Sequence, residues 1–187
     1  MSYFVNLLSY LMLGGVFFLV SNLVVELLRS ILHFPFRRVH QICLCILASV
    51  LFLILYVTLL APVYDGYEPL VRLELIPFHS FSDQWVLGNG VKYFHMAANM
   101  LMFSPLSFML AVCFKRMRKL ADNIGFCFLF SFGIEFVQYF AGRTSDIDDL
   151  MLNTLGALLG YLIYRLCHHY FKDWPLWKAV KNDKNPT

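Results

Sequence analysis

Long apolar stretches without charge constrain this chain more than any other feature. Residues 3–25, 41–64 and 93–114 contain no Asp, Glu, Lys or Arg, and residues 123–142 contain a single charged side chain. Residues 150–164 form a shorter uncharged stretch. A transmembrane helix needs about 20 mostly apolar residues, because the hydrocarbon layer is about 30 Å thick. The pattern therefore predicts five membrane-spanning helices.

The composition supports a membrane protein. Hydrophobic residues make up 59% of the chain and charged residues 14%, whereas about 25% of residues are charged in an average soluble domain. A soluble domain of 187 residues could not bury so much apolar surface and would aggregate. We therefore exclude a soluble enzyme, a nucleic-acid partner and a disordered protein, and expect an all-α, polytopic membrane helical bundle.

The charges between the apolar stretches predict the orientation. Residues 29–40 hold three Arg and no acid, and residues 115–122 hold four basic residues and one acid. Residues 65–92 and 143–149 are mainly acidic, whereas residues 165–187 hold five basic and two acidic side chains. Cytoplasmic loops are rich in Lys and Arg. We therefore predict an N-terminus outside the cell and a cytoplasmic C-terminus.

We predict one transmembrane domain over residues 1–170, with an outer loop at 63–93 and a cytoplasmic tail at 171–187. No Lys or Arg precedes the first apolar stretch, so we expect a retained helix and not a signal peptide. The five cysteines lie near predicted cytoplasmic helix ends and are interpreted as packing residues. The predicted helices cover residues 3–28, 40–62, 94–114, 122–141 and 148–166.

Seven polar side chains from three predicted helices are expected in or near the outer leaflet. Ionisable groups within a membrane are costly and usually face protein or water. Interhelical hydrogen bonding alone does not explain a carboxylate as deep as Glu135. We therefore predict a ligand-binding or reaction site formed by Asn99, Glu135, Gln138, Arg143, Asp146, Asp149 and Asn153.

Three aspartates open the last predicted helix. Asp146, Asp148 and Asp149 form a D-x-D-D run that could hold a divalent cation, although such a run is a weak metal signal by itself. In a purely structural alternative, Arg143 pairs with Asp146 and Asp148 is solvated. Thr144 or Ser145 is expected to cap the helix, whose macrodipole favours acids near its N-terminus.

Other residues predict contacts between and within helices. Gly156 and Gly160 form a small-x-x-x-small pattern, which lets two helices approach closely. Pro105 lacks a backbone donor and is expected to kink its helix. Glu26 and Arg29 are expected to form a local salt bridge. The last helix should therefore pack tightly against a neighbour below its polar start.

The polar residues also belong to an ordered set of motifs over residues 73–166. In order and spacing, this set resembles the VanZ-like membrane proteins. Ser107 stands where that family usually has Gly. The motifs are Leu75-Ile76-Pro77-Phe78, Asn99-Met-Leu-Met-Phe103-Ser-Pro105, Glu135-x-x-Gln138, Gly142-Arg143, Asp146-Ile147-Asp148-Asp149 and Asn153-Thr154-x-Gly156.

The resemblance implies a multi-pass protein of the bacterial cell membrane. It also implies a contribution to the resistance of Gram-positive bacteria to the glycopeptide teicoplanin and related lipoglycopeptides. These drugs act on the outer face, at the D-Ala-D-Ala ends of lipid-linked cell-wall precursors. The predicted outer-leaflet layer of polar residues fits that place of action, but the resemblance does not settle the molecular activity.

Three hypotheses for the activity follow. The favoured one is a binding protein, because the residues resemble a pocket more than a catalytic centre. The pocket would bind a lipid-linked cell-wall precursor, another lipid headgroup or the drug, would need no cofactor, and would lower access of the drug to its target. Function should then survive a conservative change at Glu135.

The second hypothesis is an intramembrane hydrolase or transferase that acts on cell-envelope lipids. Glu135 and Asp149 would serve as general acid and base, with a divalent cation as the candidate cofactor, and Glu135→Gln would abolish function. The third is a lipid transporter or flippase, in which Glu135 couples to protons and a homodimer completes the path. Membrane lipids are the expected partners in all three cases.

Overall fold

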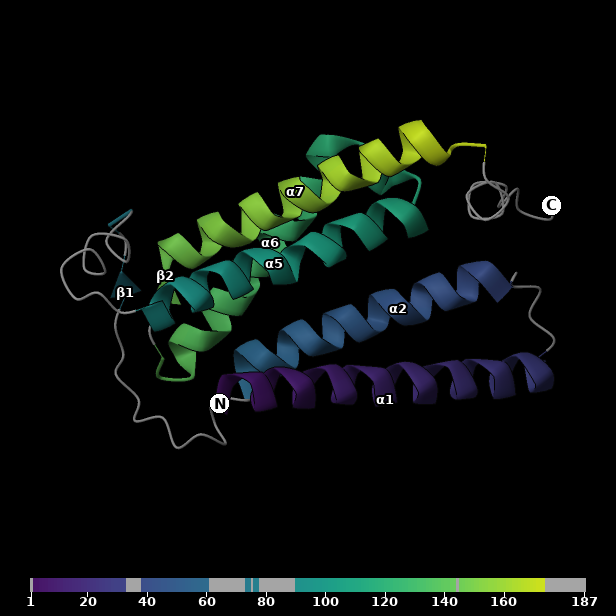
Figure 1. The fold of residues 1–187 in the computed structure, drawn as a ribbon, viewed down its shortest axis with the longest axis horizontal. Coiled ribbons are helices and arrows are strands. Elements are labelled where there is room, and N and C mark those ends of the chain that lie inside the picture. The colour runs from purple at the N-terminus through teal and green to yellow at the C-terminus, as the bar shows by residue number, and fades with distance from the viewer. Residues whose placement is uncertain are drawn as a thin grey trace.

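The computed structural model describes residues 2–32, 38–60, 73–74, 76–77, 90–143 and 145–173. Five long helices dominate this part of the chain, which confirms the predicted helical architecture (Figure 1). The helices are α1 (Ser2–Leu32), α2 (Arg38–Leu55), α5 (Gly90–Cys113), α6 (Leu120–Phe140) and α7 (Ile147–Phe171). The shorter elements are the π-helical turn η1 (Tyr56–Leu60), the 3-10 turn η2 (Arg116–Arg118) and the strands β1 (Leu73–Glu74) and β2 (Ser145–Asp146).

Three of the described helices are long and apolar enough to cross a membrane. They are Arg38–Leu60, Leu120–Phe140 and Ile147–Phe171. Shorter apolar segments lie in the other two long helices, at Met12–Leu27 and Ala97–Cys113. The last helix extends five residues beyond the predicted end at residue 166. The prediction followed the apolar stretch, whereas the helix also includes polar residues such as His168 and His169. Basic residues suit the negative end of a helix macrodipole.

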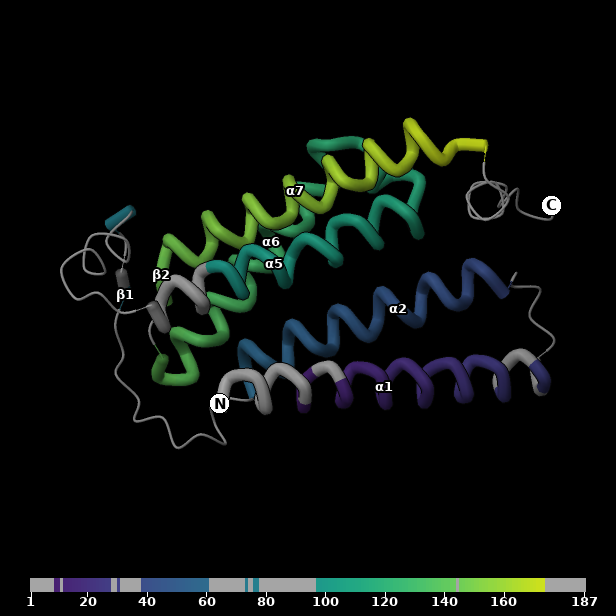
Figure 2. The backbone as a smooth tube through the Cα atoms, viewed as in Figure 1, coloured from purple at the N-terminus to yellow at the C-terminus, as the bar shows by residue number. Residues whose placement is uncertain are grey.

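The helices run up and down in two groups (Figures 1 and 2). Helix α1 packs against α2, while α5, α6 and α7 form a three-helix unit that contacts α2 through α5. The α1–α2 contact uses Gly14, where an added methyl group would lie 2.5 Å from Leu53, and the stacked rings of Phe17 and Phe52. Side chains such as Leu19, 67% exposed, cover the outer side of α1.

The closest helix contact joins α5 and α7 through the two predicted glycines. A Cβ added at Gly156 would lie 1.9 Å from the carbonyl oxygen of Met100, and one at Gly160 would lie 2.0 Å from that of Ser104. Only glycine permits this backbone approach. The small-residue pattern is therefore confirmed as a packing surface, and α5 continues as one helix through Pro105.

A neutral hydrogen-bonded junction joins α5 and α6 at the end of the unit that carries η2. Ser107, which departs from the usual family glycine, is fully buried and donates to Oδ1 of Asn123 at 2.7 Å. The amide nitrogen of Asn123 donates to the carbonyl oxygens of Ser107 and Met117. The Ser107 hydroxyl is thus satisfied by a buried partner on the next helix.

The apolar core lies between α2 and the three-helix unit. Phe103 and Leu106 are fully buried, and Ile54 is 2% exposed. Cys45, Cys113 and Cys127 are buried as well, and the five cysteines, which all lie in described helices, are free thiols. Large side chains of α6, such as Leu129, point outward instead. This apolar outer surface is typical of a helix in contact with lipid.

A short parallel ladder fixes the segment between α6 and α7. Leu73 pairs with Ser145, and Glu74 pairs with Asp146. The sequence analysis did not anticipate these strands, because two residues carry no alternating pattern. The pairing brings the segment before Ile76 and Pro77 to the start of α7.

Candidate functional site

The seven predicted polar residues are called the polar cluster below; six lie near the end of α6 and the start of α7, and Asn99 reaches them from α5. A Schellman motif ends α6: Gly142 has a φ of 80° and its N–H donates to the Tyr139 carbonyl, while the Arg143 N–H donates to the Gln138 carbonyl. A left-handed glycine after the last helical turn satisfies free carbonyls in this way. The motif turns the chain sharply and keeps Arg143 beside the end of α6.

Asp146 caps α7. Its Oδ1 accepts a hydrogen bond from the Asp148 N–H at 2.8 Å, and its backbone is extended, as an N-cap residue requires. Thr144 or Ser145 was expected to cap this helix. For Ser145 the expectation was wrong, because this residue lies in β2. Thr144 lies outside the described residues. Asp148 and Asp149 then occupy the first turn, where the macrodipole favours acids.

Asn99 and Asp149 join α5 to α7. The amide nitrogen of Asn99 donates to Oδ1 of Asp149 at 2.6 Å. A hydrogen bond to a carboxylate is short and strong compared with one between neutral groups. Arg143 lies within electrostatic reach of the same carboxylate. The structure thus brings three of the predicted residues together at one point.

Glu135 belongs to the same layer and comes from α6. Its side chain is 7% exposed, and Oε2 accepts from the Asp146 N–H at 3.1 Å. Ser145 supplies a side-chain hydrogen bond to this carboxylate, and Asp149 lies within electrostatic reach of it. Carboxylates from two different helices therefore belong to the same layer.

Gln138 and Arg143 share a backbone partner, which for Arg143 differs from the Asp146 of the structural alternative. Both donate to the carbonyl oxygen of Thr58, Gln138 at 3.0 Å and Arg143 through Nη1. Thr58 lies in η1, and its own hydroxyl donates to the Ile54 carbonyl. The two side chains therefore attach the end of α2 to the polar cluster.

Asn153 lies one turn deeper than Asp149 on α7. It is 4% exposed, and its amide nitrogen donates to the hydroxyl of Ser131 on α6 at 2.9 Å. Its Oδ1 is buried and has no hydrogen-bond partner among the described residues. The cluster therefore retains one buried acceptor that the described residues leave unsatisfied.

The aspartates do not form the predicted three-carboxylate metal site. Within the described residues, no three His, Cys, Asp or Glu side chains are close enough to share a metal ion. Asp146 binds the backbone of Asp148, and Asp149 binds Asn99, so these carboxylates are directed to different partners. Asp148 is 1% exposed, so the alternative that it is solvated was also wrong. A divalent cation at the polar cluster stays a prediction.

Among the side chains that the structure describes, acidic groups outnumber basic ones in this layer. Glu135, Asp146, Asp148 and Asp149 are accompanied by one basic member of the polar cluster, Arg143. When the carboxyl groups are ionised, the layer carries an excess of negative charge. Such a site favours a cation or an ammonium group, and hydrogen-bond donors on that group would suit the free acceptor of Asn153.

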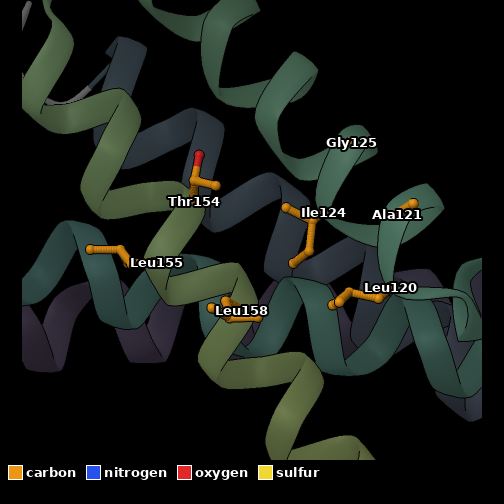
Figure 3. Close-up of a pocket in the computed structure, with 7 residues that line it drawn as sticks. All are labelled: Leu120, Ala121, Ile124, Gly125, Thr154, Leu155 and Leu158. Atoms are coloured by element: carbon orange, nitrogen blue, oxygen red, sulfur yellow. The ribbon is translucent and has the colours of Figure 1, made fainter.

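An apolar groove lies deeper in the three-helix unit, between α6 and α7 (Figure 3). Its volume is about 350 Å³. Thr154 provides the one polar side chain in its wall, and that hydroxyl donates to the Leu150 carbonyl of its own helix. The groove is therefore an apolar feature separate from the polar cluster. Its lining residues are Leu120, Ala121, Ile124, Gly125, Thr154, Leu155 and Leu158.

Sequence reasoning missed three members of the site. Thr58 contributes a backbone carbonyl, which leaves no sequence signal. Ser131 lies four residues before Glu135 and hence on the same face of α6, so helical spacing was the signal that could have found it. Ser145 was considered only as a cap, yet it is 9% exposed and contacts Glu135.

Comparison with known proteins agrees with the sequence resemblance. The profile of the VanZ/LLP1 family matches residues 41–168, which include the polar cluster and four of the five helices. The protein named Protein VanZ of Enterococcus faecium is 30% identical over 86 residues. That alignment covers 46% of this chain and 53% of the relative, so the chain spans about half the length of the curated protein that it matches. No solved structure matches the chain.

Proposed function

Because the chain belongs to the VanZ/LLP1 family and carries the polar cluster, we propose that it is a bacterial membrane protein that binds the headgroup of an envelope lipid. The ligand is a lipid-linked cell-wall precursor or another outer-leaflet lipid that carries an ammonium group. Binding would lower the access of teicoplanin-type lipoglycopeptides to their target. The molecule would thereby contribute to resistance.

The proposed topology has five spans, with the N-terminus outside and the C-terminus in the cytoplasm. Alternating helices bring the start of α5, the end of α6 and the start of α7 to one end of the bundle (Figure 1). The described parts of the basic segments, residues 29–32, 38–40 and 115–122, lie at the other end (Figure 1). Since basic segments stay in the cytoplasm, the polar cluster would then lie in the outer leaflet.

The observation that carries the proposal is the proximity of Glu135 and Asp149 within one layer. In the described part of the chain, both accept hydrogen bonds from neutral donors, the Asp146 N–H and the Asn99 amide. Neutral donors fix the carboxylates without cancelling their charge. A bound ammonium group would balance this negative charge, while Arg143 retains donors for a phosphate or carboxylate.

Teicoplanin susceptibility in a sensitive Gram-positive host that lacks a relative tests this proposal. The strains would express the wild type, Glu135→Gln, Asp149→Asn and the double variant at matched membrane levels. Each amide keeps an oxygen that can accept the existing hydrogen bond, so folding should be preserved. We expect each single variant to retain part of the protection, because one carboxylate remains, and the double variant to lose it.

Asp122→Asn is the matched control, because Asp122 pairs with exposed Arg116 at the other end of α6. This variant should protect as well as the wild type. Cells that express the wild type should also bind less labelled drug, with an unchanged lipid composition. Full protection by the double variant would show that charge at the polar cluster is not needed, and the proposal would then be wrong.

The enzyme remains the second candidate, because the buried carboxylate of Glu135 and the partly buried carboxylate of Asp149, from different helices, could act as general acid and base on a headgroup. The two candidates differ in their lipid products. An intramembrane hydrolase or transferase would produce a modified envelope lipid, visible by mass spectrometry. That lipid would disappear, together with all protection, in Glu135→Gln alone.

A further inference from the structure

A second site with buried polarity lies at the opposite end of the bundle, between α1 and α2. A groove of about 360 Å³ opens there, and it is called the α1–α2 groove below. Its walls combine two apolar side chains with four polar or charged ones. The lining residues are Asn22, Leu23, Glu26, Arg38, Gln41 and Ile42.

Gln41 is the buried group in this groove, with 7% of its surface exposed. Its amide nitrogen donates to Oε2 of Glu26 at 3.5 Å. If the Gln41 amide were turned by 180°, its oxygen would lie against the Glu26 carboxylate, which is unfavourable. Oε1 of Gln41 therefore faces away from Glu26. That oxygen is buried and has no hydrogen-bond partner in the described part of the chain. A buried oxygen of this kind needs a donor, and the described residues do not supply one.

The charges around Gln41 have both signs. Glu26 accepts hydrogen bonds and favours a cation, while Arg38 is exposed and favours an anion. Arg38 also begins α2, whose first turn, Arg38-Val-His-Gln41, contains no acid. The N-terminal end of a helix attracts anions through its free N–H groups and its macrodipole. The groove thus offers neighbouring sites for a cation and an anion.

We propose that the α1–α2 groove binds the headgroup of a phospholipid with a phosphate diester and a primary ammonium, as in phosphatidylethanolamine. The phosphate would contact Arg38, and the ammonium N–H groups would reach Glu26 and Oε1 of Gln41. A choline headgroup has no N–H to donate, and a glycerol headgroup has no positive charge. Exposed Leu23 and Ile42 would contact the acyl chains.

Binding of three lipids with identical acyl chains to the purified, delipidated protein tests this inference. Native mass spectrometry would measure the affinities for phosphatidylethanolamine, phosphatidylcholine and phosphatidylglycerol in one detergent. We expect phosphatidylethanolamine to bind at least about ten-fold more tightly than the other two, as the loss of one charge-assisted hydrogen bond implies. Glu26→Gln and Gln41→Met should each remove this preference.

Arg38→Gln provides a variant with little risk to folding, because Arg38 is exposed at the first position of α2. It should weaken the binding of all three phospholipids by a similar factor, since each carries a phosphate. The control Asp122→Asn should keep both affinity and preference. Equal affinities for the three lipids, or a preference that survives Glu26→Gln, would refute the inference and leave water as the partner of Gln41. These results do not depend on the function of the polar cluster.

Discussion

Replacement of Gly156 by alanine tests the contact that holds the polar cluster together. The added methyl carbon would lie 1.9 Å from the Met100 carbonyl oxygen, whereas ordinary contact begins at 3.4 Å. Because both partners are backbone, the strain cannot be relieved by a side-chain rotation. Helices α5 and α7 would have to separate by about 1.5 Å at this point.

That separation would stretch the hydrogen bond between Asn99 and Asp149 from 2.6 Å beyond the donor–acceptor distance at which a hydrogen bond forms. Overpacking of a tight interface costs about 1–3 kcal/mol, and the lost charged hydrogen bond adds about 1–2 kcal/mol. We therefore expect Gly156→Ala to lower the free energy of unfolding by about 2–5 kcal/mol. For a chain of this length, the corresponding fall in Tm is about 4–20 °C.

The assay is thermal unfolding of the purified protein in detergent, followed by intrinsic fluorescence. Gly133→Ala is the control, because no described atom lies within 4 Å of a Cβ added at Gly133 on α6. Alanine is a better helix former than glycine by about 0.5–1 kcal/mol, so the control should keep or raise Tm. Equal Tm values for the two variants would refute the close α5–α7 approach. Teicoplanin protection should fall with Gly156→Ala and persist with Gly133→Ala.

Two further predictions concern buried amides and the attachment of α2. Asn123→Ala should lower the free energy of unfolding by about 2–4 kcal/mol, because four hydrogen bonds disappear and the Ser107 hydroxyl loses its acceptor. Asn153→Ala should lower the free energy of unfolding by less than about 1 kcal/mol, because one hydrogen bond is lost while an unsatisfied oxygen is removed. Chemical denaturation in detergent compares the two variants, and equal losses of stability would contradict this reasoning. Arg143→Gln should accelerate amide hydrogen exchange in η1 by about ten-fold, because it removes a donor to the Thr58 carbonyl. An unchanged exchange rate would show that Gln138 alone holds that turn in place.

The helices could be predicted because a membrane leaves the backbone few alternatives. A spanning segment must satisfy its own N–H and C=O groups, so a long uncharged run implies a helix. The described helices α2, α6 and α7 follow these runs. The end of α7 was less predictable, because the helix continues beyond the apolar stretch, where polarity no longer indicates its limit.

The membership of the polar cluster could also be predicted, but most of its pairings could not. Helical spacing places Glu135 and Gln138 on one face of α6, yet only the packing shows that they bind different partners. Ser131 and Thr154 illustrate the difficulty. Each is a hydroxyl within a helix, but Ser131 accepts from another helix while Thr154 donates to its own backbone.

The cap of α7 was misplaced for a related reason. Ser, Thr and Asp are all good N-cap residues, so the run Thr144-Ser-Asp146 offers three registers to sequence reasoning. Pairing of β1 with β2 keeps Ser145 and Asp146 extended, which places the first helical residue at Ile147. Strand pairs of two residues have no periodic signal, so this choice of register had no counterpart in the sequence.

The two ends of the three-helix unit provide an internal test of whether the polar cluster is merely structural. At one end, Asn123 and Ser107 join α5 to α6 with neutral groups, and both side chains are satisfied. This junction shows that neutral hydrogen bonds are sufficient to connect these helices. At the other end, carboxylates gather from α6, β2 and the start of α7, and the buried Oδ1 of Asn153 on α7 has no hydrogen-bond partner among the described residues. A structural role would not require that charge, whereas recognition of an ammonium-bearing headgroup would use both features.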